Sequence, residues 1–208
     1  MKKIAVLLFG LLFGVSGARA AVTPDMAPEQ LVHQTTNEIL ATIKHNRAEY
    51  ANDHAKLYQL AQTKVLPYFD FERMSQWVLG RNWRTATPAQ RARFVALFRD
   101  LLVRTYSTAL LQYTDQRIIY LPVNAAPGDT QMLVRTEVQQ SGGAPDIPIY
   151  YSFFKNREGQ WKVYDVSIDG ISLVTNYRAV YASKIRQEGM EALLNSMATT
   201  DAQLQKKK

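Results

Sequence analysis

The sequence predicts an α+β fold in which a curved, mainly antiparallel sheet of four strands packs with N-terminal and C-terminal helices. Two observations indicate this class. Apolar residues recur at helical spacing over 28–113, alternate over 116–168 in segments rich in β-branched and aromatic residues, and return to helical spacing over 174–198. The strand segments are joined by short links, which favour antiparallel neighbours. We predict one domain over 21–200.

The first 20 residues have the layout of a secretory signal peptide. Lys2 and Lys3 precede an apolar run, and Ala18-Arg19-Ala20 places small residues where a signal peptidase cleaves. The run is about 14 residues long, shorter than the roughly 20 that a membrane-spanning helix needs. We therefore predict cleavage after Ala20 and export of a mature protein that is not anchored in a membrane.

The net charge of +7 over 208 residues suggests a nucleic-acid partner only at first sight. Loss of Lys2, Lys3 and Arg19 with the signal peptide reduces the 25 basic residues to 22 against 18 acidic ones. Three of those 22 are the lysines at 206–208, in a charged tail over 201–208 that we expect to fray. A nucleic-acid site needs a clustered basic surplus, so we expect no nucleic-acid partner.

Two helices are predicted in the first third of the mature chain. The first covers 28–46, where a stripe of side chains recurs every four residues from Leu31 to Ile43. The second covers 51–66 and ends at Pro67, because proline lacks the N–H that a helix interior requires.

A short helix and a long one follow. Asp70 is the predicted N-cap of a helix through Val78, and Gly80 is placed to close it. Thr87-Pro88-Ala89-Gln90 combines a threonine cap, a proline at the first helical position and a glutamine at the third, which together signal a helix start. That helix is predicted to run to about Tyr113, a span of about 26 residues and about 39 Å.

The second half of the chain supplies the strands. They are predicted over Gln116–Val123, Gln131–Gln139, Ile147–Lys155 and Gln160–Ile168. Turn-forming residues separate them or follow the last, at Pro127-Gly128-Asp129, Gly142-Gly143, Asn156 to Gly159 and Asp169-Gly170. The two C-terminal helices are predicted over about 174–186 and 188–197.

More apolar surface points inward than a two-layer core needs. In the third predicted strand Ile149, Tyr151 and Phe153 share one face, while Tyr150 and Phe154 share the other. The long helix is also apolar over more than one narrow stripe. Two interpretations are open at this point: helices cover both faces of the sheet, or an apolar cavity lies between the sheet and the helices.

The sequence contains no recognisable catalytic or cofactor-binding motif. It has no cysteine, and the spacing of His33, His45 and His54 matches no metal-binding pattern. The glycine-rich loops that bind nucleotide phosphates and the serine nucleophile elbow do not occur. We expect neither a cofactor nor a metal, and we expect that the protein is not an enzyme.

Asp165 is the one candidate for catalysis. A carboxylate near Tyr150, Tyr151 and Tyr164 could abstract a proton in an apolar site. The alternative, which we favour, is that Asp165 pairs with a cation across the sheet and that Asp169-Gly170 only makes a turn.

Several arginines and tryptophans have two interpretations each. The arginines either lie on solvent-exposed helix faces or meet an anionic headgroup; they are Arg81, Arg84, Arg99, Arg104 and Arg178. The tryptophans either fill the core or form a ligand platform; they are Trp77, Trp83 and Trp161.

Two sets of residues form a joint signature over about 31–194. The first comprises Phe69-Asp70-Phe71, Met74, Val78-Leu79-Gly80, Trp83, Ala86-Thr87, Gln90, Phe94, Phe98, Leu101, Leu102, Tyr106, Leu110 and Tyr113. The second comprises Trp161-Lys162-Val163-Tyr164-Asp165-Val166, Gly170-Ile171-Ser172 and Asn176-Tyr177-Arg178. Together they resemble the toluene-tolerance family of periplasmic phospholipid-binding proteins.

The resemblance implies a nuclear-transport-factor-two-like sheet with added helices around an apolar pocket for phospholipid tails. It also implies a periplasmic carrier that moves phospholipid between an outer-membrane lipoprotein–porin complex and an inner-membrane ABC transporter complex, maintaining outer-membrane lipid asymmetry. We expect such a carrier to act as a monomer. An exported binding protein for another apolar ligand, such as a quinone or a sterol, and a small enzyme using Asp165 are the alternatives.

The pocket that the resemblance implies would be lined from three parts of the chain. The helical candidates are Trp77, Phe98, Leu102, Tyr106 and Leu110. The sheet candidates are Val134, Val138, Ile149, Tyr151, Phe153, Val163 and Val166. The C-terminal candidates are Ile171 and Tyr177.

Overall fold

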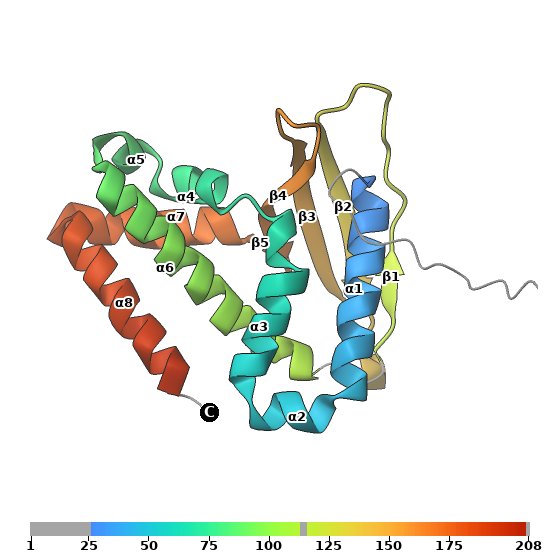
Figure 1. Cartoon of the computed structure of the whole chain (residues 1–208). Coiled ribbons are helices and arrows are strands. Elements are labelled where there is room, and N and C mark those ends of the chain that lie inside the picture. Colours follow the sequence, from blue (N-terminus) through green and yellow to red (C-terminus); the bar gives the residue numbers. More distant parts are fainter. Residues whose placement is uncertain (1–25, 113–115, 207–208) are drawn as a thin grey trace, which may run out of the picture.

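The computed structural model of the chain describes residues 26–112 and 116–206. The predicted signal peptide over 1–20 lies outside the described residues. Helices come first, one sheet follows, and two helices end the chain (Figure 1). The predicted α+β class is confirmed.

The bounds of the elements follow the predicted order. The helices before the sheet are α1 (Pro28–His45), α2 (Arg47–Asn52), α3 (His54–Lys64), η1 (Leu66–Tyr68), α4 (Phe71–Leu79), α5 (Arg81–Thr85), α6 (Pro88–Ser107) and η2 (Thr108–Gln112). The strands are β1 (Ile118–Tyr120), β2 (Gln131–Val138), β3 (Ile147–Lys155), β4 (Trp161–Ile168) and β5 (Ile171–Ser172), with the short helix η3 (Ser141–Gly143) between β2 and β3. The C-terminal helices are α7 (Leu173–Glu188) and α8 (Met190–Lys206).

The sheet has five strands in the order β1-β2-β3-β4-β5, and every neighbouring pair is antiparallel. The predicted four-stranded sheet lacks β5. Asp169 and Gly170 have φ angles of 51° and 77°, and this two-residue turn folds β5 back onto β4. β1 is shorter than predicted, since it ends two residues before Pro122, which has no N–H to donate to a neighbouring strand.

The second predicted helix, over 51–66, is divided in the structure. Asp53 lies between α2 and α3, and its carboxylate accepts hydrogen bonds from the backbone N–H groups of Ala55 and Lys56. An aspartate that caps backbone N–H groups in this way starts a new helix instead of continuing the previous one. The chain then turns through η1 at Pro67, where the helix was predicted to end.

The caps predicted for α4 and α6 are confirmed. The Asp70 carboxylate accepts the N–H of Arg73 at 2.8 Å. Thr87 Oγ1 accepts the N–H of Gln90 at 3.2 Å, and the Gln90 side chain accepts the N–H of Thr87 at 2.9 Å. Gly80, with φ 54°, separates α4 from α5. These caps fix where the helices that cover the sheet begin and end.

α6 is shorter than predicted. It ends at Ser107 after 20 residues, a length of about 30 Å, and the chain continues as the tighter helix η2. Tyr113, the predicted end, lies outside the described residues. Thr105, Ser107 and Thr108 gather at this end, and their side chains favour the α-helix less than straight apolar side chains do. Leu110 lies in η2, so its side chain no longer lies on the apolar face of α6.

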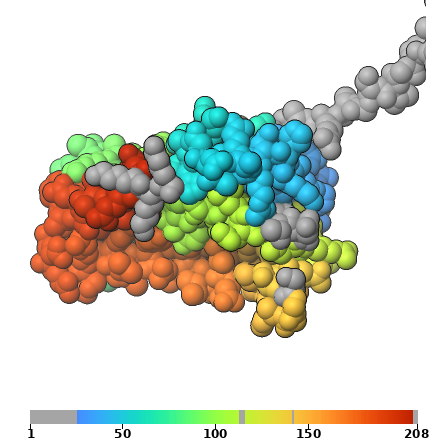
Figure 2. All heavy atoms as spheres, turned by 90° about the horizontal axis from the view of Figure 1, so that it is seen from below, coloured from blue at the N-terminus to red at the C-terminus, as the bar shows by residue number. Residues whose placement is uncertain are grey.

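The C-terminal helix α8 extends through most of the predicted charged tail over 201–208 and reaches Lys206. Asp201 is only 9% exposed, and its carboxylate accepts a hydrogen bond from Arg104 of α6 at 2.6 Å. The Arg104 guanidinium also lies 5.0 Å from the centre of the Tyr58 ring in α3. Arg104 thus connects α8 to α6 and to α3. The prediction that the chain frays from residue 201 was wrong for the residues through Lys206, which are helical. In Figure 2 the red α8 and the cyan α2–α3 surface both border the green α6.

The main apolar core lies between one face of the sheet and the helices α1, α4, α6, α7 and α8. Phe94, Phe98, Phe153 and Met74 are completely buried in it. A second, smaller cluster joins α1, α2 and α3; it consists of Ile39, Ile43, Tyr50 and Leu57. Over 26–112 and 116–206, no helix combines the length and apolar character needed to cross a membrane.

Candidate functional site

One face of the sheet is apolar and turned toward the helices. Alternate side chains of a strand point to the same face, and the register places Val134 opposite Tyr151 and Met132 opposite Phe153. Phe98 of α6 belongs to the same buried core as the apolar side chains of this face. The predicted site residues that are buried together here are Phe98, Leu102, Val134, Phe153, Val163 and Val166.

Four more predicted residues border that cluster as half-buried side chains. They are Tyr106, Ile149, Tyr151 and Tyr177. The Tyr177 ring of α7 meets the Phe98 ring of α6 edge to face, with centroids 5.3 Å apart. The structure therefore brings together ten of the predicted residues along the junction of the sheet, α6 and α7.

The other four predicted residues lie elsewhere. Leu110 packs against the second apolar cluster, and Val138 is half-buried at the end of β2. Trp77 and Ile171 are 50% and 59% exposed, and the Trp77 ring lies 5.4 Å from that of Tyr164. Periodicity predicts which side chains share a face, but it does not indicate what covers that face. Contact between any of the fourteen residues and a ligand remains a prediction.

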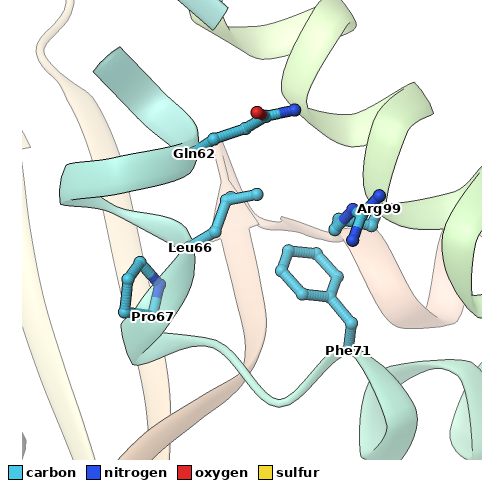
Figure 3. Close-up of a pocket in the computed structure, with 5 residues that line it drawn as sticks. All are labelled: Gln62, Leu66, Pro67, Phe71 and Arg99. Carbon is cyan, nitrogen blue, oxygen red and sulfur yellow. The ribbon is translucent and has the colours of Figure 1, made fainter. Parts of the chain in front are cut away.

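None of the fourteen residues lines either of two hollows that lie on the surface of the described part of the chain. The first has a volume of about 390 Å³ and lies between η1, α4 and α6. Figure 3 shows Leu66 and Phe71 pointing toward one another across it, with Gln62 and Arg99 beside them. The Arg99 guanidinium is already paired with Asp100 at 2.9 Å.

The second hollow has a volume of about 580 Å³ and lies between the α4–α5 corner and α7. Leu79, Ala182 and Ile185 form its apolar part. Three arginines supply its charge; they are Arg81, Arg178 and Arg186. Two of these arginines, Arg81 and Arg178, are candidates from the sequence, but only the fold shows that they lie close together.

Asp165 holds α7 against the sheet. One carboxylate oxygen accepts the hydroxyl of Ser172 at 2.6 Å, and the other accepts the backbone N–H of Val174 at 3.1 Å. The cation partner predicted for Asp165 was therefore wrong. In the register Asp165 lies opposite Ser152, whose neighbour Tyr151 points to the other face of the sheet, so the proposed carboxylate–tyrosine group does not form around Tyr151. Among the described residues, no cluster of three or more acidic or histidine side chains could hold a metal ion.

A sequence model of the MlaC protein family matches residues 33–199. The chain belongs to the MlaC family. The match extends from α1 into α8 and so includes the sheet and every element that packs on its apolar face.

Curated relatives and a solved structure agree with this membership. The intermembrane phospholipid transport system binding protein MlaC of Haemophilus influenzae is 25% identical over 205 residues, which is 98% of this chain and 95% of that protein. The toluene tolerance protein ttg2D of Pseudomonas putida is 29% identical over 187 residues, 89% of this chain and 86% of that one. The phospholipid-binding protein of Ralstonia solanacearum, solved in complex with a phospholipid, superposes with a TM-score of 0.79 at 33% identity and covers 87% of this chain and 100% of its own.

Several MlaC signature residues of this chain organise the backbone and do not line the apolar face. Asp70 caps α4 and also donates its N–H to the Val163 carbonyl of β4 at 2.9 Å. Ser172 caps α7 through the N–H of Thr175 and donates to Asp165. The signature therefore includes the joints by which the helices attach to the sheet.

Burial of tyrosines in the MlaC fold gives this chain a pH dependence above pH 10. Burial raises the pKa of Tyr151 and of Tyr177 to about 12, and it raises the pKa of Tyr181 as well. A tyrosine in the unfolded chain loses its proton near pH 10. Between pH 10 and 12 the unfolded state therefore binds fewer protons than the folded state, so stability falls as pH rises.

We expect urea midpoints measured from pH 8 to pH 12 to be level below about pH 10 and to fall above it. The loss from Tyr151 alone is at most about 2–3 kcal/mol. Tyr151→Phe should make the fall less steep, because the hydroxyl whose pKa burial raises is then absent. A fall of equal steepness in Tyr151→Phe and the parent chain would contradict the assignment.

Proposed function

We propose that this protein binds phospholipid and carries it through the periplasm between an outer-membrane lipoprotein–porin complex and an inner-membrane ABC transporter complex. The observation that carries the proposal is the likeness to the Ralstonia solanacearum protein, which holds a phospholipid and shares the fold over its whole length. The predicted signal peptide supports the location, and the resemblance supports the two partner complexes. A monomer suffices for this function.

The acyl chains are proposed to lie along the junction of the sheet, α6 and α7. The half-buried residues Tyr106, Ile149 and Tyr177 mark where these layers meet. Phe98 and Phe153 are completely buried behind them, so loading requires the helices and the sheet to move apart. Apolar side chains then exchange contacts with one another for contacts with the alkyl chains, which keeps the change in buried apolar area small.

The energetics of such a ligand favour transfer by direct contact with a donor or an acceptor. Two ~16-carbon chains contain roughly 30 methylenes, and burying them contributes on the order of 20 kcal/mol. Spontaneous release into water is therefore negligible. The carrier needs no nucleotide site of its own if a partner complex supplies the energy.

The identity of the ligand is tested by mass spectrometry of an organic extract. The full chain is produced in a Gram-negative host so that its signal peptide is processed, and the purified protein is extracted. We expect glycerophospholipids at about one per protein chain. A quinone or a sterol in their place would support a carrier of another apolar ligand, and an extract without apolar molecules would contradict the carrier function.

The location of the ligand is tested by a charge on the apolar face. Ile149→Asp or Tyr106→Asp is expected to reduce the co-purified lipid at least several-fold, because a carboxylate against alkyl chains must be desolvated. Leu133→Asp is the matched control for Ile149→Asp, since Leu133 lies on the neighbouring strand β2 and is 46% exposed. Equal lipid content in a folded Ile149→Asp variant and in the control would place the lipid elsewhere.

A further inference from the structure

The hollow beside α7 combines an apolar floor with positive charge and contains no acidic residue. Leu79 is almost completely buried and belongs to the main core, and Ile185 packs against that core. Arg81, Arg178 and Arg186 line the same hollow and are exposed. An apolar floor under three guanidinium groups is complementary to an anionic amphiphile.

The backbone at Gly80 is arranged to admit one of these arginines. Gly80 has φ 54°, and a Cβ at this position would lie 3.2 Å from Nη2 of Arg178. Arg178, Ala182 and Ile185 are spaced by four and three residues, so they share one face of α7. The α4–α5 corner and this face of α7 therefore form the two walls of the hollow.

The three arginines lack acidic partners in the described part of the chain. Other basic residues of the C-terminal helices and α6 are paired: Lys184 with Glu188 at 3.0 Å and Arg104 with Asp201 at 2.6 Å. Glu188 is the one acidic residue in α7, so the pair with Lys184 leaves none there for Arg178 or Arg186. The charge of the hollow is thus not compensated from within the described fold.

We propose that this hollow binds the phosphodiester of an anionic phospholipid headgroup, an inference that rests on the carrier function proposed above. The planar guanidinium of arginine matches the oxygens of a phosphate and can bind two of them at once. No carboxylate lines the hollow to receive an ammonium group, so a glycerol headgroup fits it better than choline or ethanolamine. Leu79, at the floor of the hollow, belongs to the main core. The same core contains Phe98 and Phe153 of the proposed acyl-chain site, so the headgroup site and the acyl-chain site share one apolar cluster.

The test uses soluble short-chain lipids below their micelle concentration. Dihexanoyl phosphatidylglycerol, dihexanoyl phosphatidylcholine and inorganic phosphate are titrated into lipid-stripped mature protein by calorimetry. The variant of the hollow, here called the groove variant, is Arg178→Gln/Arg186→Gln. The matched control is Arg117→Gln/Arg157→Gln, which removes the same charge from two other exposed positions. Melting temperatures verify that both variants are folded.

We expect the groove variant to bind phosphatidylglycerol at least about tenfold more weakly than the parent, and the control to change about twofold or less. The parent should prefer phosphatidylglycerol to phosphatidylcholine, and this preference should shrink in the groove variant. Equal affinity of parent and groove variant for phosphatidylglycerol would overturn the headgroup site while leaving the carrier function standing. Inorganic phosphate binding as tightly as the lipid would identify free phosphate as the ligand and overturn it too. A parent that binds neither lipid and yields no lipid on extraction would overturn both proposals.

Discussion

Phe98→Ala is expected to lower the free energy of unfolding by about 3–5 kcal/mol. The Phe98 side chain is completely buried, and its ring lies 5.6 Å from that of Phe94. It also meets Tyr177 and Tyr181 edge to face at 5.3 and 6.4 Å. Alanine removes these contacts and leaves a cavity where α6 faces α7, so the lost transfer free energy and the cavity both contribute.

Urea denaturation of lipid-stripped protein is the measurement for Phe98→Ala, because a bound ligand would add its own stabilisation to the folded state. Val180→Ala is the control, since Val180 is apolar, lies on α7 and is 55% exposed. We expect the control to change stability by no more than about 0.5 kcal/mol. If the two variants lost the same stability, the packing of α6 against α7 described above would be incorrect.

Helix starts could be predicted from the sequence because their signals are local. The capping box of Thr87 and Gln90 and the cap at Asp70 each involve residues within three positions of one another. The strands were predicted for the same reason, since alternation and turn residues are read along one segment. Asp169-Gly170 was correctly predicted as a turn, but the two residues after it were too few to show a strand pattern.

Helix ends could not be predicted as well, because tertiary partners decide them. Asp201 is one of several charged or polar residues near the C-terminus, and nothing in its sequence neighbourhood indicates its basic partner. Its partner Arg104 is 97 positions away, and their pairing keeps the last turns of α8 on α6. Leu110 was placed on the stripe of α6, but the change to η2 directs it toward the second apolar cluster.

In the candidate site, burial could be predicted where the signal is local, but not where the packing of another element decides. Phe153 was predicted from strand alternation to share a face with Ile149 and Tyr151. It is buried together with the pocket candidates Val134 and Val163. Trp77 was included because of its residue type, and Ile171 because of its place in the signature. Both are half exposed or more. A period shows which face is apolar, whereas exposure depends on which other element covers that face.

The arginines of the second hollow illustrate what only the fold can provide. Arg81 and Arg178 are separated by almost a hundred residues and lie in helices with ordinary polar faces. Their proximity depends on the break at Gly80 and on the packing of α4 against α7. A sequence in which basic residues are scattered can therefore fold into a compact positive site.

Asp165→Ala is expected to lower the free energy of unfolding by about 2–4 kcal/mol, because it removes two hydrogen bonds to a half-buried carboxylate. The same carboxylate lies at the N-terminus of α7, where negative charge is favourable. Amide hydrogen exchange should rise first at Val174 and in the following turn of α7, ahead of the sheet. Asp165→Asn keeps one accepting oxygen and should lose less stability than alanine does.

A double-mutant cycle with Ser172 separates this anchoring role from a general loss of packing. Ser172 donates to Asp165 at 2.6 Å, so removing either partner should already cost most of what their shared bond contributes. We expect the sum of the stability losses of Asp165→Ala and Ser172→Ala to exceed the loss of the double variant by about 1 kcal/mol or more. Strictly additive losses would mean that the two residues stabilise the fold independently, and that the Asp165–Ser172 hydrogen bond does not itself hold α7 to β4. Coupled losses would show that the Asp165 carboxylate connects α7 to the sheet. The proposed separation of these layers during lipid loading would then have to break this connection or turn about it.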